Sequence, residues 1–177
     1  MMLNTAFCFL VCGSFCFGQT YEQLMSYSHY YSKDIDAFKE FINKEPAATH
    51  ANYGIQQVVY EFHNHSVGLE EHKSDNGKIG EIYVFQTNEN HTKANYEWKK
   101  YFDSMNNNPS FQFVKAIFDD GVTKDNNLTL ENFTTLLNSK NINSDSSYGV
   151  RYKKSDVYYS LFVIKGKLVF TVDDKNF

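Results

Sequence analysis

The residues best suited to chemistry lie in one short stretch, Glu61-Phe62-His63-Asn64-His65. Imidazole and carboxylate groups are common ligands of zinc, copper and nickel. Two histidines separated by one residue can bind the same ion if they lie on a β-strand, where alternate side chains project to one face. The spacing therefore predicts a metal site formed by Glu61, His63 and His65. The competing interpretation is a solvated polar face at the end of an amphipathic strand.

A second candidate site uses aromatic side chains near the C-terminus. The chain contains 16 Phe, 13 Tyr and 1 Trp, and an exposed row of tyrosines can stack on a sugar ring or on a peptide. The residues best placed for such a ligand are Tyr148, Arg151, Tyr152 and Tyr158. The alternative is that these rings fill the core, where aromatic side chains contribute most of their buried area.

Composition and motifs argue against several function classes. A formal net charge of −4 disfavours a nucleic-acid partner, which needs a basic surface. The sequence contains no Gly-x-Ser-x-Gly, phosphate loop or His-Glu-x-x-His motif. Its three cysteines, Cys8, Cys12 and Cys16, all precede residue 18, so the rest of the chain has no thiol for a disulfide, a nucleophile or a metal thiolate. We therefore expect no cofactor and favour a function without catalysis.

The first residues have the pattern of an export signal. Residues 1–18 carry no charge, and the run from Thr5 to Phe17 is almost entirely apolar. A run of about 13 residues is too short to span a membrane but fits the apolar region of a secretory signal. We therefore expect a signal peptide over residues 1–18, cleavage after Gly18, and a secreted or periplasmic mature chain without a transmembrane segment.

Two features of the sequence indicate a bacterial group. The predicted cleavage point is followed by Gln19-Thr20-Tyr21-Glu22-Gln23-Leu24-Met25 and then by a short helix carrying Phe38 and Lys39. The chain is also rich in Lys, Asn, Tyr and Phe. In both respects it resembles small exported proteins of Bacteroidota. This resemblance covers only the opening of the mature chain, and it implies export but no activity and no site residues.

Hydrophobic periodicity places the candidate sites on an α+β domain. The predicted helices cover residues 32–44, 91–105 and 130–138, with a shorter one at 21–31. The predicted strands cover residues 58–62, 81–87, 111–118, 148–153, 157–164 and 167–172. Because short turns join consecutive strands, we expect an antiparallel sheet with about three helices packed on it and a three-stranded meander at the C-terminus.

The mature chain, residues 19–177, has no linker rich in Pro, Gly or Ser, which predicts a single domain. We expect an exported, non-enzymatic binding or structural module whose ligand is a protein, a peptide or a glycan. Two alternatives remain open. One is a metal-dependent enzyme or metal-binding protein that uses His63 and His65, and the other is an inhibitor or immunity-type partner of an exported enzyme.

Overall fold

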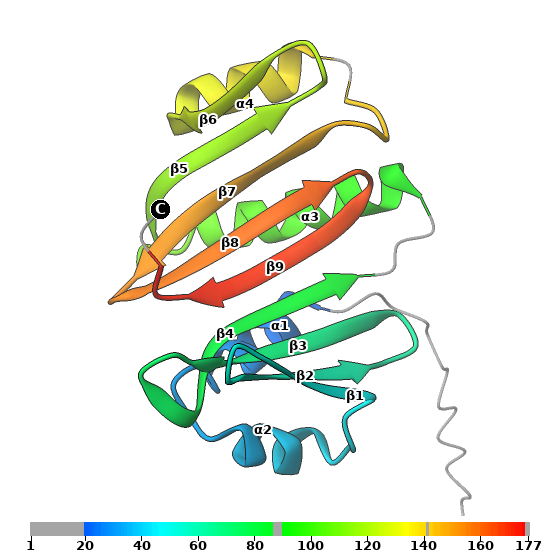
Figure 1. Cartoon of the computed structure of the whole chain (residues 1–177). Coiled ribbons are helices and arrows are strands. Elements are labelled where there is room, and N and C mark those ends of the chain that lie inside the picture. The colour runs from blue at the N-terminus through cyan, green and yellow to red at the C-terminus, as the bar shows by residue number, and fades with distance from the viewer. Residues whose placement is uncertain (1–19, 87–89, 141, 176–177) are drawn as a thin grey trace, which may run out of the picture.

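The computed structural model describes residues 20–86, 90–140 and 142–175, which form a nine-stranded antiparallel sheet with four helices (Figure 1). The expected signal peptide lies outside the described residues. The helices are α1 (Tyr21–Ser28), α2 (Ile35–Ile42), α3 (His91–Asn106) and α4 (Leu130–Ser139). The strands are β1 (Ala48–Asn52), β2 (Ile55–Glu61), β3 (His65–His72), β4 (Asp75–Gln86), β5 (Gln112–Asp119), β6 (Lys124–Leu128), β7 (Ser147–Lys154), β8 (Val157–Ile164) and β9 (Lys167–Asp173).

The strands lie in the order β1-β2-β3-β4-β9-β8-β7-β5-β6. The predicted α+β class and the C-terminal meander β7-β8-β9 are confirmed. A second meander, β2-β3-β4, lies beside the first, and the two are joined where β4 pairs with β9. The middle of the sheet is therefore built from segments that are far apart in the sequence.

Helix α3 confirms the helix predicted over residues 91–105. Its N-terminus is capped by Asn90, whose side-chain oxygen accepts a hydrogen bond from the backbone N–H of Lys93 at 2.9 Å. Its buried residues are Ala94, Trp98, Tyr101, Phe102 and Met105, which recur at three- and four-residue steps. Helix α4 is capped in the same way, since the side-chain oxygen of Thr129 accepts a hydrogen bond from the backbone N–H of Asn132.

Three strands were not predicted from the sequence. Strands β1 and β6 lie at the two edges of the sheet, and four of the five residues in each are exposed. Their sequences therefore show no alternation of apolar and polar residues from which a strand could be predicted. Strand β3 contains Gly68 and a run of polar residues after Leu69. These residues interrupt the alternation of apolar and polar side chains that identifies a strand. Strand β3 forms a hairpin with β2, closed where the backbone N–H of Phe62 donates to the carbonyl of His65 at 2.8 Å.

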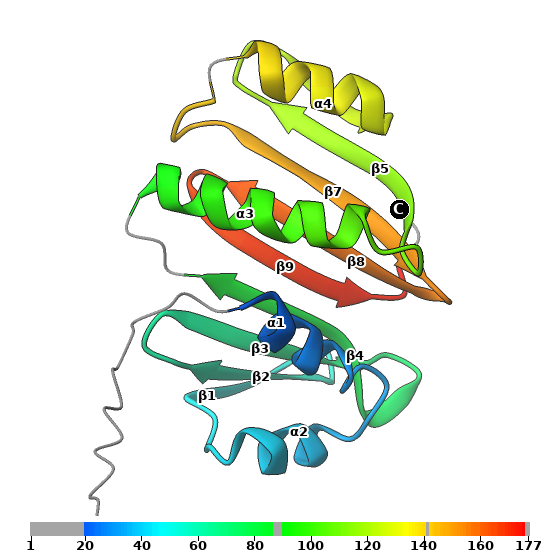
Figure 2. The ribbon, with the colours of Figure 1, turned by 180° about the vertical axis from the view of Figure 1, so that it is seen from behind.

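The core lies between the sheet and the helices, all four of which pack on the same face (Figures 1 and 2). We call this the inner face. One row of side chains crosses it in register through seven strands and is almost fully buried: Tyr60, Val67, Val84, Phe170, Leu161, Val150 and Ala116. Burial of each large apolar side chain contributes about 1.5–3 kcal/mol. The indole N–H of Trp98 donates to the carbonyl of Leu161 at 3.0 Å, which fixes α3 over the sheet.

Candidate functional site

The opposite face of the sheet, which we call the outer face, carries no described helix (Figure 1). Strand register aligns its side chains in three rows that cross from β3 to β5. The apolar row is Ser66, Phe85, Val169, Phe162, Gly149 and Ile117. The mixed row is Gly68, Tyr83, Thr171, Ser160, Arg151 and Lys115. The charged row is Glu70, Glu81, Asp173, Tyr158, Lys153 and Gln112. The outer face is the candidate site because its polar and apolar groups are ordered by the sheet itself.

Aromatic rings on the outer face lie directly on glycines of the neighbouring strands. A Cβ placed on Gly149 would lie 2.1 Å from a ring atom of Phe162, and one placed on Gly68 would lie 1.8 Å from the ring of Tyr83. The rings thus cover the backbone of the next strand and extend the apolar surface across it. Phe85 and Ile164 remain 41% and 43% exposed. The outer face therefore presents an apolar strip that is only partly covered by its own side chains.

Arg151 of the mixed row and Asp173 of the charged row form a buried ion pair. The guanidinium of Arg151 donates to Asp173 Oδ1 at 2.6 Å and to the hydroxyl of Ser160 at 2.7 Å, although Arg151 and Asp173 are only 5% and 2% exposed. It lies over the ring of Tyr158, 4.7 Å from the centroid. A further bond reaches the carbonyl of Lys175. Both charges are therefore paired and hydrogen-bonded, as burial of charge requires.

The residues after β9 are held on the acidic side of the outer face. The ammonium of Lys175 donates to Glu81 and lies 4.0 Å from Glu70. Burial lowers the pKa of Lys175, but the two carboxylates outweigh this effect and the pKa is raised. The adjacent Asp174 lies 3.3 Å from His72 Nε2. Acidic side chains thus gather on β3, β4 and β9, whereas Arg151 stands on β7.

The predicted row of exposed aromatic ligand residues is wrong. Strand alternation sends Tyr148 and Tyr152 to the inner face, where their hydroxyls donate to Asn95 at 2.7 Å and to Asn106 at 3.3 Å. Burial raises the pKa of both tyrosines. Arg151 and Tyr158 do lie on the outer face, but they are buried by their neighbours. The four residues therefore divide between two faces and form no common surface.

The predicted grouping of Glu61, His63 and His65 on one strand face is also wrong. Glu61 ends β2 and is exposed, His63 lies exposed in the turn, and His65 begins β3 and is buried. Alternation applies only within a strand, and here a hairpin turn interrupts it. In the part of the chain that the structure describes, no three His, Cys, Asp or Glu side chains are grouped so that they could hold a metal ion.

His65 instead belongs to a buried hydrogen-bonded chain. Its Nδ1 lies 2.8 Å from Asn64 Oδ1, so the ring N–H donates there and Nε2 accepts from the hydroxyl of Tyr27 at 3.1 Å. Tyr27 in turn accepts from the amide of Gln23. Phe62 stacks on the imidazole at 4.5 Å with an interplanar angle of 6°. Desolvation by burial lowers the pKa of His65 to about 4, which keeps the ring neutral and makes it an anchor between α1 and the β2-β3 hairpin.

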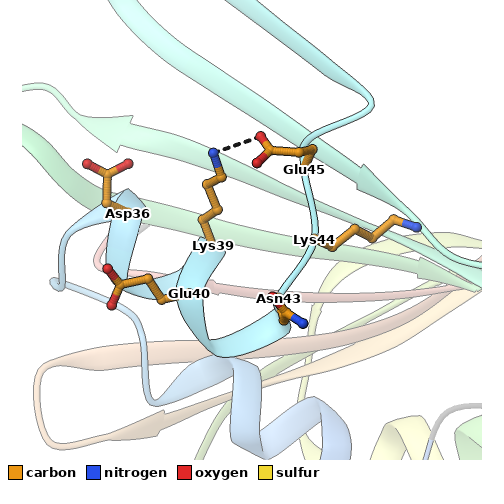
Figure 3. Close-up of a pocket in the computed structure, with 6 residues that line it drawn as sticks. All are labelled: Asp36, Lys39, Glu40, Asn43, Lys44 and Glu45. Carbon is orange, nitrogen blue, oxygen red and sulfur yellow. Dashed lines mark ion pairs between the residues drawn. The ribbon is translucent and has the colours of Figure 1, made fainter.

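A polar hollow of about 580 Å³ lies at the end of α2 (Figure 3). The ammonium of Lys39 points to Glu45 at 2.7 Å, whereas Lys44 is directed away from both (Figure 3). Asp36 and Glu40 project from the helix without meeting a cation in this view. The hollow is lined by exposed charged side chains that do not converge on one point, and we do not assign it a ligand.

Comparison with protein families, curated proteins and solved structures gives no match to this chain. None of the helices in the described residues is long and apolar enough to cross a membrane.

Proposed function

We propose that this protein is an exported, non-enzymatic binding module that holds a partner against the outer face of its sheet. The observation that carries the proposal is the apolar row, which runs across six strands on a face without a described helix. In and beside this row Phe85 and Ile164 are 41% and 43% exposed, whereas Val169 is only 5% exposed, and exposed apolar side chains on a sheet face are typical of interaction surfaces. The run from Thr5 to Phe17 supports export.

The chemistry of the outer face favours a protein over a glycan. Protein interfaces combine apolar and polar groups and are enriched in aromatic residues, and the apolar row, which carries Phe85 and Phe162, lies beside the mixed row. Sugar recognition needs hydroxyl or amide groups beside an exposed ring. The hydroxyls of Tyr148 and Tyr152, the tyrosines first considered for a sugar, are committed to Asn95 and Asn106 on the inner face. On the outer face of β4 and β8 the most exposed apolar side chains are Phe85 and Ile164.

The proposal is tested with a photo-reactive amino acid placed at Phe85 and, in a matched control, at Val122. Val122 is 92% exposed and lies between β5 and β6, away from the outer face. We expect a protein partner that crosslinks from position 85 only. With that partner purified, Phe85→Lys should weaken binding at least about tenfold, and Val122→Lys should leave it unchanged. Equal crosslinking from both positions, or catalytic turnover of a bound molecule, would contradict the proposal.

A further inference from the structure

A small cavity of about 230 Å³ lies between α3 and α4 and is lined by residues of both helices and of the segment after α4. Both helices pack on the inner face (Figure 2), so the cavity and the outer face lie on opposite sides of the sheet. The helices are in contact through Phe133 of α4, whose ring meets those of Trp98 and Phe102 edge to face, at centroid distances of 5.9 and 6.3 Å.

The buried part of the cavity lining is apolar. Phe102 is 8% exposed, and Leu137 and Ile142 are partly buried against the core. Trp98, which also lines the cavity, is stacked on Phe102 at 5.0 Å with an interplanar angle of 9°. Because the two rings cover each other, neither presents an open face on which a sugar could stack. The lining instead provides an apolar wall that can enclose a small hydrocarbon group.

The more exposed part of the lining supplies hydrogen-bond donors. The side-chain oxygen of Asn95 accepts from the hydroxyl of Tyr148 at 2.7 Å, so the amide nitrogen is the group that remains to donate. Lys99 and Asn138 are exposed. Within the described residues, the side chains of Lys99 and Asn138 form no ion pair or hydrogen bond. The ammonium of Lys99 and two amides are therefore available to a ligand.

The charge of this lining differs from that of the protein as a whole. The formal net charge is −4, yet among the described residues no acidic side chain lines the cavity. The hollow at the end of α2, by contrast, is lined by Asp36, Glu40 and Glu45. A cation and two amides thus lie beside an apolar wall without a competing carboxylate. This arrangement is complementary to a single anionic group attached to an apolar body.

We propose that the cavity between α3 and α4 binds a small carboxylate with an apolar body, such as an arylalkyl acid or a short fatty acid. The carboxylate accepts from Lys99, Asn95 and Asn138. The hydrocarbon part lies against Phe102 and Leu137. Sites for drug-sized ligands have volumes of about 300–1,000 Å³, so this cavity takes a smaller ligand, on the order of ten non-hydrogen atoms. A ligand of that size binds with a dissociation constant on the order of 100 μM.

The first experiment titrates the purified protein with phenylacetate and with hexanoate. Binding is followed by the fluorescence and the indole N–H NMR signal of Trp98, the only tryptophan, which lines the cavity. We expect a saturable change with at least one of the two acids. Phenylacetamide has the same apolar body without the charge, and acetate has the charge without the body. Each should bind at least about tenfold more weakly than the better acid.

The second experiment changes the lining. Lys99→Gln should raise the dissociation constant of the acid at least about tenfold, whereas Lys100→Gln removes the same charge one residue along α3, outside the lining, and should leave it unchanged. Thr134→Phe should abolish binding because the larger side chain fills the cavity. The hydroxyl of Thr134 donates only within α4, to the carbonyl of Leu130. Thr135→Phe, at an exposed position outside the lining, is the matched control. Circular dichroism verifies that each variant is folded.

Four outcomes would overturn the inference. The first is no change in either Trp98 signal with phenylacetate or hexanoate up to about 10 mM, a hundred times the expected dissociation constant. The second is equal affinity for phenylacetamide and phenylacetate, which would contradict the anionic group. The others are equal effects of Lys99→Gln and Lys100→Gln, and binding that survives Thr134→Phe. None of these results concerns the outer face, whose partner is tested separately by crosslinking from position 85.

Discussion

The neutral state of His65 makes the stability of this protein depend on pH between about 4 and 6.5. Burial lowers its pKa from the ordinary value of 6.5 to about 4. Between these two values the unfolded chain binds a proton that the folded chain does not bind, so acidification favours unfolding. The stabilising contribution of the neutral ring is therefore complete above pH 6.5 and is lost as the pH falls to about 4.

The magnitude follows from the difference between the two pKa values, at 1.36 kcal/mol for each pH unit that separates them. The contribution lost is about 2 kcal/mol at pH 5 and about 3 kcal/mol at pH 4. These losses have a structural cause. A proton on Nε2 would remove the acceptor of the Tyr27 hydroxyl, and the charge would lie against the stacked ring of Phe62.

The assay is urea unfolding at pH 7, 6, 5 and 4, followed by the fluorescence of Trp98, which is buried in the core and is the only tryptophan. Wild type is compared with His65→Gln, which keeps a donor and an acceptor but does not titrate. His63→Gln, in the exposed turn, is the matched control. Carboxylates with a lowered pKa, such as Glu71 and Asp120, lose their contribution in all three proteins and cancel in the comparison.

We expect wild type and His63→Gln to lose about 3 kcal/mol more than His65→Gln between pH 7 and pH 4. The three free energies of unfolding should run parallel above pH 7. Equal losses in wild type and His65→Gln would refute the reasoning, because they would mean that water or a counter-charge reaches the imidazole in the folded protein.

Three further predictions concern export, the buried ion pair and the outer face. Protein recovered from the cell envelope or the medium should begin at Gln19 by N-terminal sequencing, and an uncleaved chain in the cytoplasm would contradict export. Arg151→Met should lower the free energy of unfolding, measured in urea, by about 3–5 kcal/mol because it leaves Asp173 buried without its cation. Adding Asp173→Leu should recover most of that loss. No recovery in the double variant would show that the two residues are not coupled. Gly149→Ala should cost about 1–3 kcal/mol, since the new Cβ would meet Phe162, and an unchanged unfolding midpoint would show that β7 and β8 separate easily there.

The elements that the sequence predicts best are those whose apolar pattern is local. The stripe of Trp98 and Phe102 defines α3, and the alternating run from Val157 to Ile164 coincides with β8. The edge strands β1 and β6 are polar because the sheet must not continue beyond them, so hydrophobicity gives no signal there. The β2-β3 turn lacks Gly and Pro, so no turn signal separates His63 from His65 and the pattern predicts a single strand there.

The candidate site could not be predicted because it depends on register. The columns Glu81-Tyr83-Phe85 and Gly149-Arg151-Lys153 are visible as alternating patterns within each strand. Nothing local indicates that β4 pairs with β9, or that Asp173 reaches Arg151 across β8. These are long-range pairings, and the side chains that meet on the outer face come from segments up to about half the chain apart.

The position of β9 has a consequence for the way this protein is made. β9 follows every other strand in the sequence, yet it occupies the centre of the sheet between β4 and β8. As the chain emerges from its N-terminus, β1 to β4 and β5 to β8 can form separate sheets, but they cannot join until the last strand arrives. Folding of the whole sheet must therefore wait until β9 has been synthesised. A premature stop before Lys167 would not trim an edge; it would leave two unconnected half-sheets, each exposing the backbone groups that β9 normally pairs.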